Sequence, residues 1–440
     1  MTRAANLTWP LFVGTLLGTS SCAPVTGPLA AEVVVRAGDA YELATVQLES
    51  VTDLFGGGTE RFDVRAGGGF YAAPATEGAE LDGLDVEAFW ASSRAPYGEL
   101  RPDLTFDGER WVARDFDGLY YLTVLYNLER SFLHLETLRD RDPFVPGSRV
   151  EVSLYGTPLA TKALPIPVVL GDNAAYSPGA DQFLIVPVIS QRAGAPPFMD
   201  EAVATHELHH RVFFHRVMSR DDVFPLYKRL IYAQLYRNSD ASADDPNATA
   251  PVVEVYSPTE ARSLQLLKGF DEGLADVFAV SFTGDPDLLG RVLPEAAAMR
   301  HLEGEFARTG TFADLEDGTL SRQFAAACQV DGQGNNFARL GVNHYCVGTL
   351  LAASLWQASG PDPQRFREEL VPSIGPALDD IAAGMVDLTP AGQALVFSLE
   401  LALEALARHA PAPLQEALCA AFATRFGRLL DTGSVPTCAP

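Results

Sequence analysis

The 440-residue sequence has few basic residues, few cysteines and no long apolar run after its N-terminus. It contains 32 Lys and Arg against 57 Asp and Glu, which gives a formal net charge of −25. A nucleic-acid-binding protein needs a basic surface to replace phosphate counterions, so we expect no nucleic-acid partner. The absence of roughly 18 consecutive apolar residues argues against a membrane-spanning helix. With 47% hydrophobic residues, the chain can still bury a large core.

The five cysteines divide into one near the N-terminus and four in the C-terminal part of the chain. Cys328 and Cys346 are 18 residues apart, and Cys419 and Cys438 are 19 residues apart. An even set of this kind predicts disulfides in an oxidising compartment. Three pairings are compatible with four cysteines, and proximity favours the two local ones.

Residues 1–22 predict export. Arg3 is followed by a short apolar stretch over residues 7–17, and small residues then lead to Cys22. The segment resembles a bacterial lipoprotein signal, in which the cysteine is lipidated and becomes the first residue of the mature protein. Plain secretion is the alternative. We expect an exported or cell-envelope monomer that contacts a membrane only through a lipid on Cys22.

The order of predicted elements indicates an α+β fold in three parts after the signal. Residues 23–108 contain short β-branched segments separated by glycines and then an acidic, loop-like stretch, so they predict a small β module and a linker. Residues 109–278 predict a lobe that combines strands and helices. Residues 279–440 predict a mainly helical C-terminal lobe.

Apolar spacing locates the main elements of the middle lobe. Residues recurring at three and four positions predict helices over 117–138 and 199–215. Continuous apolar runs at 164–170 and 182–190, with turn residues between them, predict a pair of strands. Residues 239–252 are small and polar and predict a surface loop.

The segment His206-Glu207-Leu208-His209-His210 matches H-E-x-x-H. On a helix, His206 and His210 lie one turn apart on the same face and can bind one metal ion. Glu207 projects beside them, where it can take a proton from a metal-bound water. A His-rich surface helix is the alternative. The metzincin pattern is excluded, because Phe213 and Arg216 stand where it needs Gly and His.

A pair of carboxylates downstream is the candidate for a third ligand. Glu272 and Asp276 are separated by four residues, so a helix places them on one face. One carboxylate can then bind the metal while the other accepts the N–H of a ligating histidine. Such pairs are often only solvated, and it is the combination with H-E-x-x-H that favours a metal site.

HELHH followed by DEGLAD resembles the gluzincin metallopeptidases, closest to the thermolysin and fungalysin families, over about residues 112–360. The resemblance implies a zincin-type fold, with a mixed sheet lobe that has an antiparallel edge strand, and one catalytic Zn²⁺. His206, His210 and Glu272 would be the ligands, Glu207 the general base and Asp276 the residue that orients a histidine.

The resemblance extends to other segments. Asn173 and Ala174 are similar to the segment of those families at the edge strand that pairs with the substrate backbone. His344 occupies the position of a histidine that stabilises the transition state, and a tyrosine commonly assists it. Tyr232 and Tyr236 are both candidates for that tyrosine. A buried histidine and a plain turn are the alternatives for His344 and Asn173.

Two features depart from the families. Between His210 and Glu272 lie 61 residues, which an insertion over about 217–268 would explain, and Asp271 replaces the usual Asn. The sequence therefore predicts a zinc-dependent endopeptidase acting on peptides or proteins. A catalytically inactive envelope lipoprotein that keeps the scaffold for binding or structure is the alternative. Calcium stabilises some relatives, but no spaced carboxylate loop predicts a calcium site here.

Overall fold

A computed structural model gives the fold of the protein. It describes residues 29–38, 40–49, 51–54, 58–59, 62–66, 102–137, 150–154, 174–177, 182–185, 197–226, 258–292, 299–320, 324, 328, 343–360, 362–389 and 392–439. Several predictions fall outside these residues: the signal and Cys22, the strand at 164–170, Asn173, Tyr232, Tyr236 and the loop at 239–252.

The fold is α+β, as predicted, and its N-terminal strands contribute to two sheets. The first sheet has the order β2-β1-β7-β6. Strand β1 (Leu29–Ala37) and strand β2 (Ala40–Leu48) form an antiparallel hairpin, and β1 runs parallel to β7 (Trp111–Ala113). Strand β6 (Leu104–Phe106) is the edge strand beside β7 and pairs with it in antiparallel orientation. Residues 104–106 belong to the stretch that the sequence predicted to be a linker.

The second sheet is mixed and has six strands. Its order is β3 (Val51–Asp53), β4 (Gly58–Thr59), β5 (Phe62–Ala66), β8 (Val150–Leu154), β10 (Gln182–Ile185) and β9 (Ala174–Ser177). Strands β5, β8 and β10 are parallel, and the edge strand β9 is antiparallel to β10. The prediction of a separate N-terminal β module is therefore wrong. Period-two patterning identifies a strand but not its partner, and parallel partners lie far apart in sequence.

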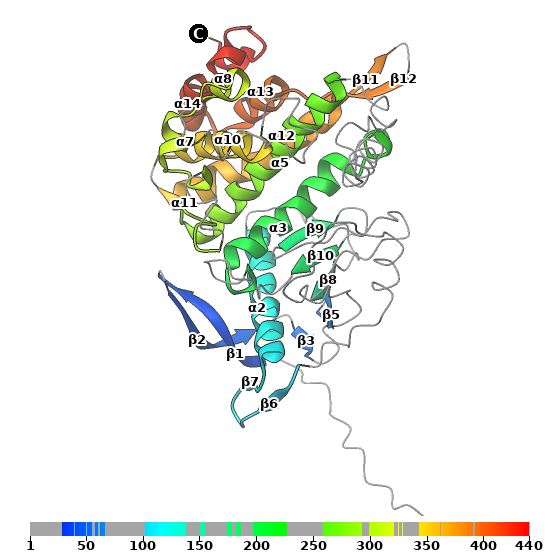
Figure 1. Cartoon of the computed structure of the whole chain (residues 1–440), viewed down its shortest axis with the longest axis vertical. Coiled ribbons are helices and arrows are strands. Elements are labelled where there is room, and N and C mark those ends of the chain that lie inside the picture. Colours follow the sequence, from blue (N-terminus) through cyan, green and yellow to red (C-terminus); the bar gives the residue numbers. More distant parts are fainter. Residues whose placement is uncertain are drawn as a thin grey trace, which may run out of the picture.

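Helices form most of the rest of the described chain (Figure 1). The first three are α2 (Phe116–Thr137), α3 (Glu201–Phe213) and α5 (Pro258–Thr283); the turn Pro197–Met199 precedes α3 and a π-helical turn, Phe214–Met218, follows it. The C-terminal helices are α7 (Glu305–Thr309), α8 (Phe312–Asp317), α10 (His344–Ala358), α11 (Pro363–Arg365), α12 (Val371–Gly384), α13 (Leu399–His409) and α14 (Ala412–Leu430). Short turns at Phe366–Leu370 and Pro436–Cys438 and a hairpin of β11 (Val386–Thr389) and β12 (Gly392–Leu395) complete this part.

The helices predicted over 117–138 and 199–215 are present with small shifts at their ends. Residues 258–268, the last part of the predicted insertion over about 217–268, form the first turns of α5. Pro258 and Glu260 suit a helix N-terminus, where a missing N–H is tolerated and negative charge is favourable. The predicted lobe boundary at 278 also falls inside this helix. Among the described residues, no helix combines the length and apolarity needed to cross a bilayer.

Helix α5 is central because it packs on both α3 and α10 (Figure 1). Gly269 and Gly273 allow the close approach to α10. A Cβ at Gly273 would lie 2.6 Å from the carbonyl oxygen of Gly348, and one at Gly269 would lie 2.9 Å from that of His344. Because real Cβ atoms do not approach so closely, these positions fix how α10 sits on the helix that carries Glu272.

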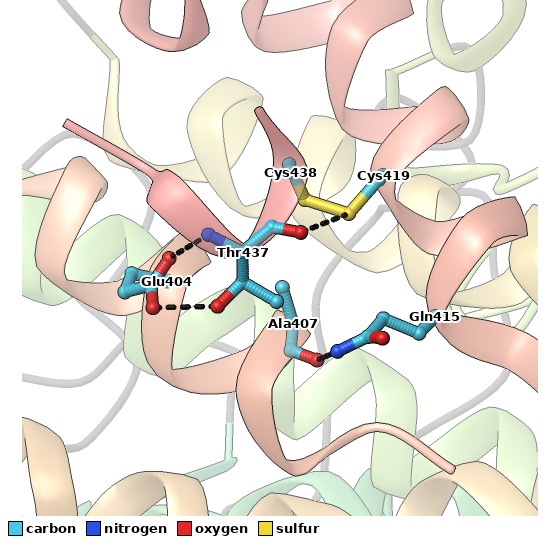
Figure 2. Close-up of a disulfide and its surroundings, with 6 residues drawn as sticks. All are labelled: Glu404, Ala407, Gln415, Cys419, Thr437 and Cys438. Carbon is cyan, nitrogen blue, oxygen red and sulfur yellow. Dashed lines mark hydrogen bonds between the residues drawn. A yellow bond between two sulfur atoms is a disulfide. The ribbon is translucent and has the colours of Figure 1, made fainter. Parts of the chain in front are cut away.

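Both predicted disulfides are confirmed. Cys328 bonds to Cys346 in the first turns of α10, and both residues are buried. Cys419 of α14 bonds to Cys438 in the last turn of the described chain. Figure 2 shows this second disulfide beside Thr437, whose backbone N–H and hydroxyl donate to the Glu404 carboxylate at 2.9 and 2.6 Å.

Candidate metal centre

Helix α3 presents the two histidines of the H-E-x-x-H segment. Asp200 begins the helix: its Oδ1 accepts the backbone N–H of Ala202 at 2.8 Å. This cap satisfies one of the free N–H groups of the first turn. His206 and His210 follow at four-residue spacing, and their ring centroids are 4.8 Å apart. Both rings lie on the side of α3 that meets α5.

Helix α5 provides the third donor. The Nε2 atoms of His206 and His210 are 3.2 Å apart. One Glu272 oxygen lies 3.4 Å from Nε2 of His206, and the other lies 4.0 Å from Nε2 of His210. Ligands bound to tetrahedral zinc at its usual bond lengths are separated by about 3.3 Å. The three side chains therefore fit a zinc ion, and they are the one group of this kind identified in the described part of the chain.

Each histidine is backed by its own carboxylate. Nδ1 of His206 lies 3.0 Å from Oδ1 of Asp276, as the sequence predicts for Asp276. Nδ1 of His210 lies 2.9 Å from Oδ2 of Asp271, a partner that the sequence analysis did not identify. A carboxylate at Nδ1 favours the tautomer with the proton on that nitrogen, which leaves the Nε2 lone pair for a metal.

Burial and charge oppose each other at these groups. Burial would lower the pKa of both histidines, but nearby carboxylates outweigh it: Asp276 and Glu272 raise the pKa of His206, and Asp271 raises that of His210 to about 10. Burial would raise the pKa of Glu272, but His206, His210 and Arg300 hold it below its ordinary value. The third donor therefore stays ionised, which suits a metal ligand.

Arg300 is a buried cation that connects two of the carboxylates. Its guanidinium donates to both oxygens of Asp276 at 2.6 and 3.2 Å and to Glu272 at 3.3 Å. Its side chain is 7% exposed. Fork-like pairing with a carboxylate is geometrically specific, so Arg300 restricts the orientation of both acids. Sequence reasoning missed this residue because it lies 28 positions beyond Glu272 and belongs to no motif.

Glu207 is buried one position after His206. Burial raises the pKa of its carboxyl group. Its side chain lines a small, mostly apolar cavity together with Val203, Phe183 and Ala174. Ala174 begins the edge strand β9 and is buried. The structure therefore brings the predicted base and one of the two predicted substrate-binding residues to the same cavity.

His344 begins α10, capped by Asn343. Burial lowers the pKa of His344 to about 4, so its imidazole is neutral at pH 7. Its ring lies 4.2 Å from that of Tyr345, over which the Arg300 guanidinium sits at 5.0 Å. The Glu272 carboxylate and then burial raise the pKa of Tyr345, so its phenol keeps its proton. Tyr345 is a third residue that sequence reasoning missed, after Asp271 and Arg300, although it is adjacent to a predicted one.

The remaining histidines of the region have other surroundings. His209 is buried and stacks on Phe278 with ring centroids 4.2 Å apart, and it is not a member of the group of metal donors. His134 of α2 contacts Ser281 at 2.9 Å.

The chain matches no protein-family model, and a search of curated proteins finds no match. The chemistry of the site must therefore be inferred from its own residues.

Proposed function

We propose that the protein is a zinc-dependent endopeptidase of the gluzincin type. The observation that carries this proposal is the convergence of two Nε2 atoms and one carboxylate at zinc-ligand spacing, with Glu207 adjacent. Each histidine also has a carboxylate behind it, an arrangement that sets the tautomer a metal requires. A His-rich surface helix would need none of these features.

A zinc ion in this site would act as a Lewis acid toward the scissile carbonyl and make water nucleophilic at neutral pH. Glu207 accepts the proton of the attacking water and delivers it to the leaving nitrogen. Its position directly after His206 keeps its carboxylate beside the metal donors, and its burial limits competing bulk water.

The edge strand β9 is proposed to bind the substrate backbone. It lies last in the six-stranded sheet and packs against α3. An extended peptide added to this edge would bring a backbone carbonyl toward the donors on α3. The cavity that Ala174 and Glu207 share lies next to this edge. The antiparallel direction of β9 relative to β10 agrees with the zincin-type sheet that the resemblance implies.

His344 is proposed to donate a hydrogen bond to the oxyanion that develops on the carbonyl. A neutral imidazole carries an N–H donor, and burial keeps His344 neutral. Donors that are already oriented in a water-poor site stabilise such charge strongly. Tyr345, held between Arg300 and His344, is placed to keep that ring in position.

The two disulfides agree with a protein exported to an oxidising compartment. We propose that Cys22 anchors it to the cell envelope, and that it acts there as a monomer on peptides or proteins. Incorporation of labelled lipid into the full chain, compared with Cys22→Ser, tests the anchor.

The mechanism is tested with Glu207→Gln in the zinc-loaded protein. Cleavage of unstructured casein should fall by about 10²- to 10⁴-fold in kcat, because a positioned base contributes about that much. Zinc content should stay at one ion per chain. Glu201→Gln is the matched control: Glu201 begins the same helix and pairs with Arg130 at 3.1 Å, away from the donors. Full activity of Glu207→Gln, or wild-type protein that binds zinc without hydrolysing any peptide, would contradict the proposal.

A further inference from the structure

The β1–β2 hairpin contacts the ends of both helices that carry the metal donors. Arg36 and Tyr41 are directly opposite each other in this hairpin and therefore lie on the same face of the sheet. The two helices run antiparallel beside each other, since His206 meets Asp276 while His210 meets Asp271. The N-terminus of α3 thus lies at the same end of the pair as the C-terminus of α5.

Tyr41 holds the start of α3. Its hydroxyl donates to Oδ2 of Asp200 at 2.7 Å. Asp200 is fully buried, and its other oxygen accepts the N–H of Ala202. Both oxygens of the capping residue are therefore engaged, one by the helix and one by the hairpin. Asp200 precedes His206 by six residues, so a shift of the cap moves the first histidine.

Arg36 holds the segment that follows α5. Its guanidinium pairs with Oδ2 of Asp285, which also accepts from Arg291 at 2.9 Å. The other oxygen of Asp285 accepts the N–H of Asp287 at 2.9 Å. The side chain of Arg36 is 13% exposed, so this pair is largely removed from water. Asp285 lies two residues after the last residue of α5, and Arg36, Arg291 and the backbone of Asp287 all bind its carboxylate.

We infer that Arg36 and Tyr41 are positioning residues that tie the N-terminus of α3 to the C-terminus of α5, and so set the distance between the histidine donors and Glu272. The inference rests on the proposed zinc function. A metal site requires its donors to be held within about 0.5 Å, and donors on two separate helices need both helices fixed. One cross-strand residue pair contacts the N-cap of α3 and the segment just after α5, so the N-terminal hairpin supports both ends of the metal centre.

The test uses three variants of the full chain: Tyr41→Phe, Arg36→Met and the double variant that carries both changes. Each is compared with the control variant Arg110→Met. Arg110 pairs with Glu32 of the same hairpin at 2.9 Å and with Asp107 at 3.5 Å, both outside the two metal-binding helices, so it is a matched control. Zinc dissociation constants are measured by competition with a chromophoric chelator, and kcat, KM and melting of the metal-free protein are recorded. The combined variant should bind zinc about threefold to tenfold more weakly, the usual size of a coupling through packed elements. Arg36→Lys should recover part of this loss.

The outcomes separate the two proposals. If the wild-type chain binds no zinc, the proposed function fails. If the wild type binds zinc and the combined variant melts earlier but keeps the wild-type dissociation constant, the hairpin only stabilises the fold and the inference is wrong. If the combined variant does not fold, Tyr41→Phe alone decides the question, because it removes one hydroxyl and keeps the ring.

Discussion

Two regions of the molecule are closed by disulfides over nearly the same sequence separation, 18 and 19 residues, but in different surroundings. In the crossing region, where α5 packs on α10, Cys346 is fully buried two residues after His344. In the C-terminal region, formed by α12, α13, α14 and the last turn, Cys419 and Cys438 are partly exposed; Figure 2 shows the disulfide that joins them. Similar covalent closure therefore supports the candidate site in one region and holds the chain end in the other.

The ion pairs of the two regions differ in the same way. Arg300 and Asp276 are 7% and 1% exposed in their side chains, whereas Arg408 and Asp380 are 55% and 40% exposed. Removing one partner of a buried pair leaves an uncompensated charge, while an exposed pair is screened by water. Mutations in the crossing region should therefore have larger effects than matched mutations in the C-terminal region.

The largest effect is expected for Asp276→Asn. It leaves the buried Arg300 with a weaker partner and takes the ionised acceptor from Nδ1 of His206. We expect a loss of about 3–5 kcal/mol in unfolding free energy and about 10- to 100-fold weaker zinc binding. Urea unfolding of metal-free protein and chelator competition measure the two effects. Asp380→Asn is the control and should change stability by no more than about 1 kcal/mol. Equal losses in both variants would remove the distinction between the regions.

The next largest effect is expected from removing each disulfide. Replacing both cysteines of either pair with serine should cost about 3 kcal/mol, because loops of 18 and 19 residues restrict the unfolded chain almost equally. Zinc affinity should fall only in the Cys328→Ser/Cys346→Ser variant, since Cys346 lies in the first turns of α10 beside the site. Unchanged zinc binding in that variant would show that the buried disulfide acts on stability alone.

A smaller effect is expected from the close packing of α5 on α10. Gly273→Ala places a Cβ against the Gly348 carbonyl and should cost about 2 kcal/mol, because a packed backbone cannot easily move away. Gly427→Ala in α14 meets no atom within 4 Å and should be neutral, or up to about 1 kcal/mol stabilising. The melting temperatures of both variants check this contrast. It would be wrong if Gly273→Ala had the melting temperature of the wild type.

The part of the site that could be predicted from sequence is the part set within single helices. Four-residue spacing places His206 with His210, and Glu272 with Asp276, on common helix faces, and the structure brings these faces together. Proximity in sequence also identified both disulfides correctly. Each of these inferences needs only local periodicity or short chain separation.

Contacts between distant elements could not be predicted. Arg300 reaches Glu272 only because the chain after α5 folds back, and no spacing encodes that return. The pairing of β5 with β8 joins strands more than 80 residues apart, so the N-terminal strands were wrongly assigned to a separate module. The contact of Tyr41 with Asp200 spans 159 residues. Tertiary packing decides these contacts, and a single sequence does not specify it locally.

The smallest expected effect is a dependence of stability on pH that arises at His134. His134 packs against the C-terminal end of α5, next to Ser281 and Phe282. Burial, and then the charges of Arg367 and Arg130, lower its pKa to about 3. Because the unfolded chain takes up this proton near pH 6.5 and the folded protein does not, stability falls as the pH decreases from 6.5 toward 3.

By pH 5.5 the loss from His134 should reach about 1.4 kcal/mol relative to pH 8. The unfolding free energies of the wild type and His134→Gln are measured in urea at both pH values. The loss due to His134 is the amount by which the wild type loses more stability between pH 8 and pH 5.5 than the variant does. In the C-terminal region His409 forms a partly exposed pair with Asp380, so His409→Gln should change the unfolding free energy at pH 8 by no more than about 1 kcal/mol. If the unfolding free energy of His134→Gln fell between pH 8 and pH 5.5 as much as that of the wild type, protonation of another group would cause the loss. The buried side of α5 would then not limit stability at low pH.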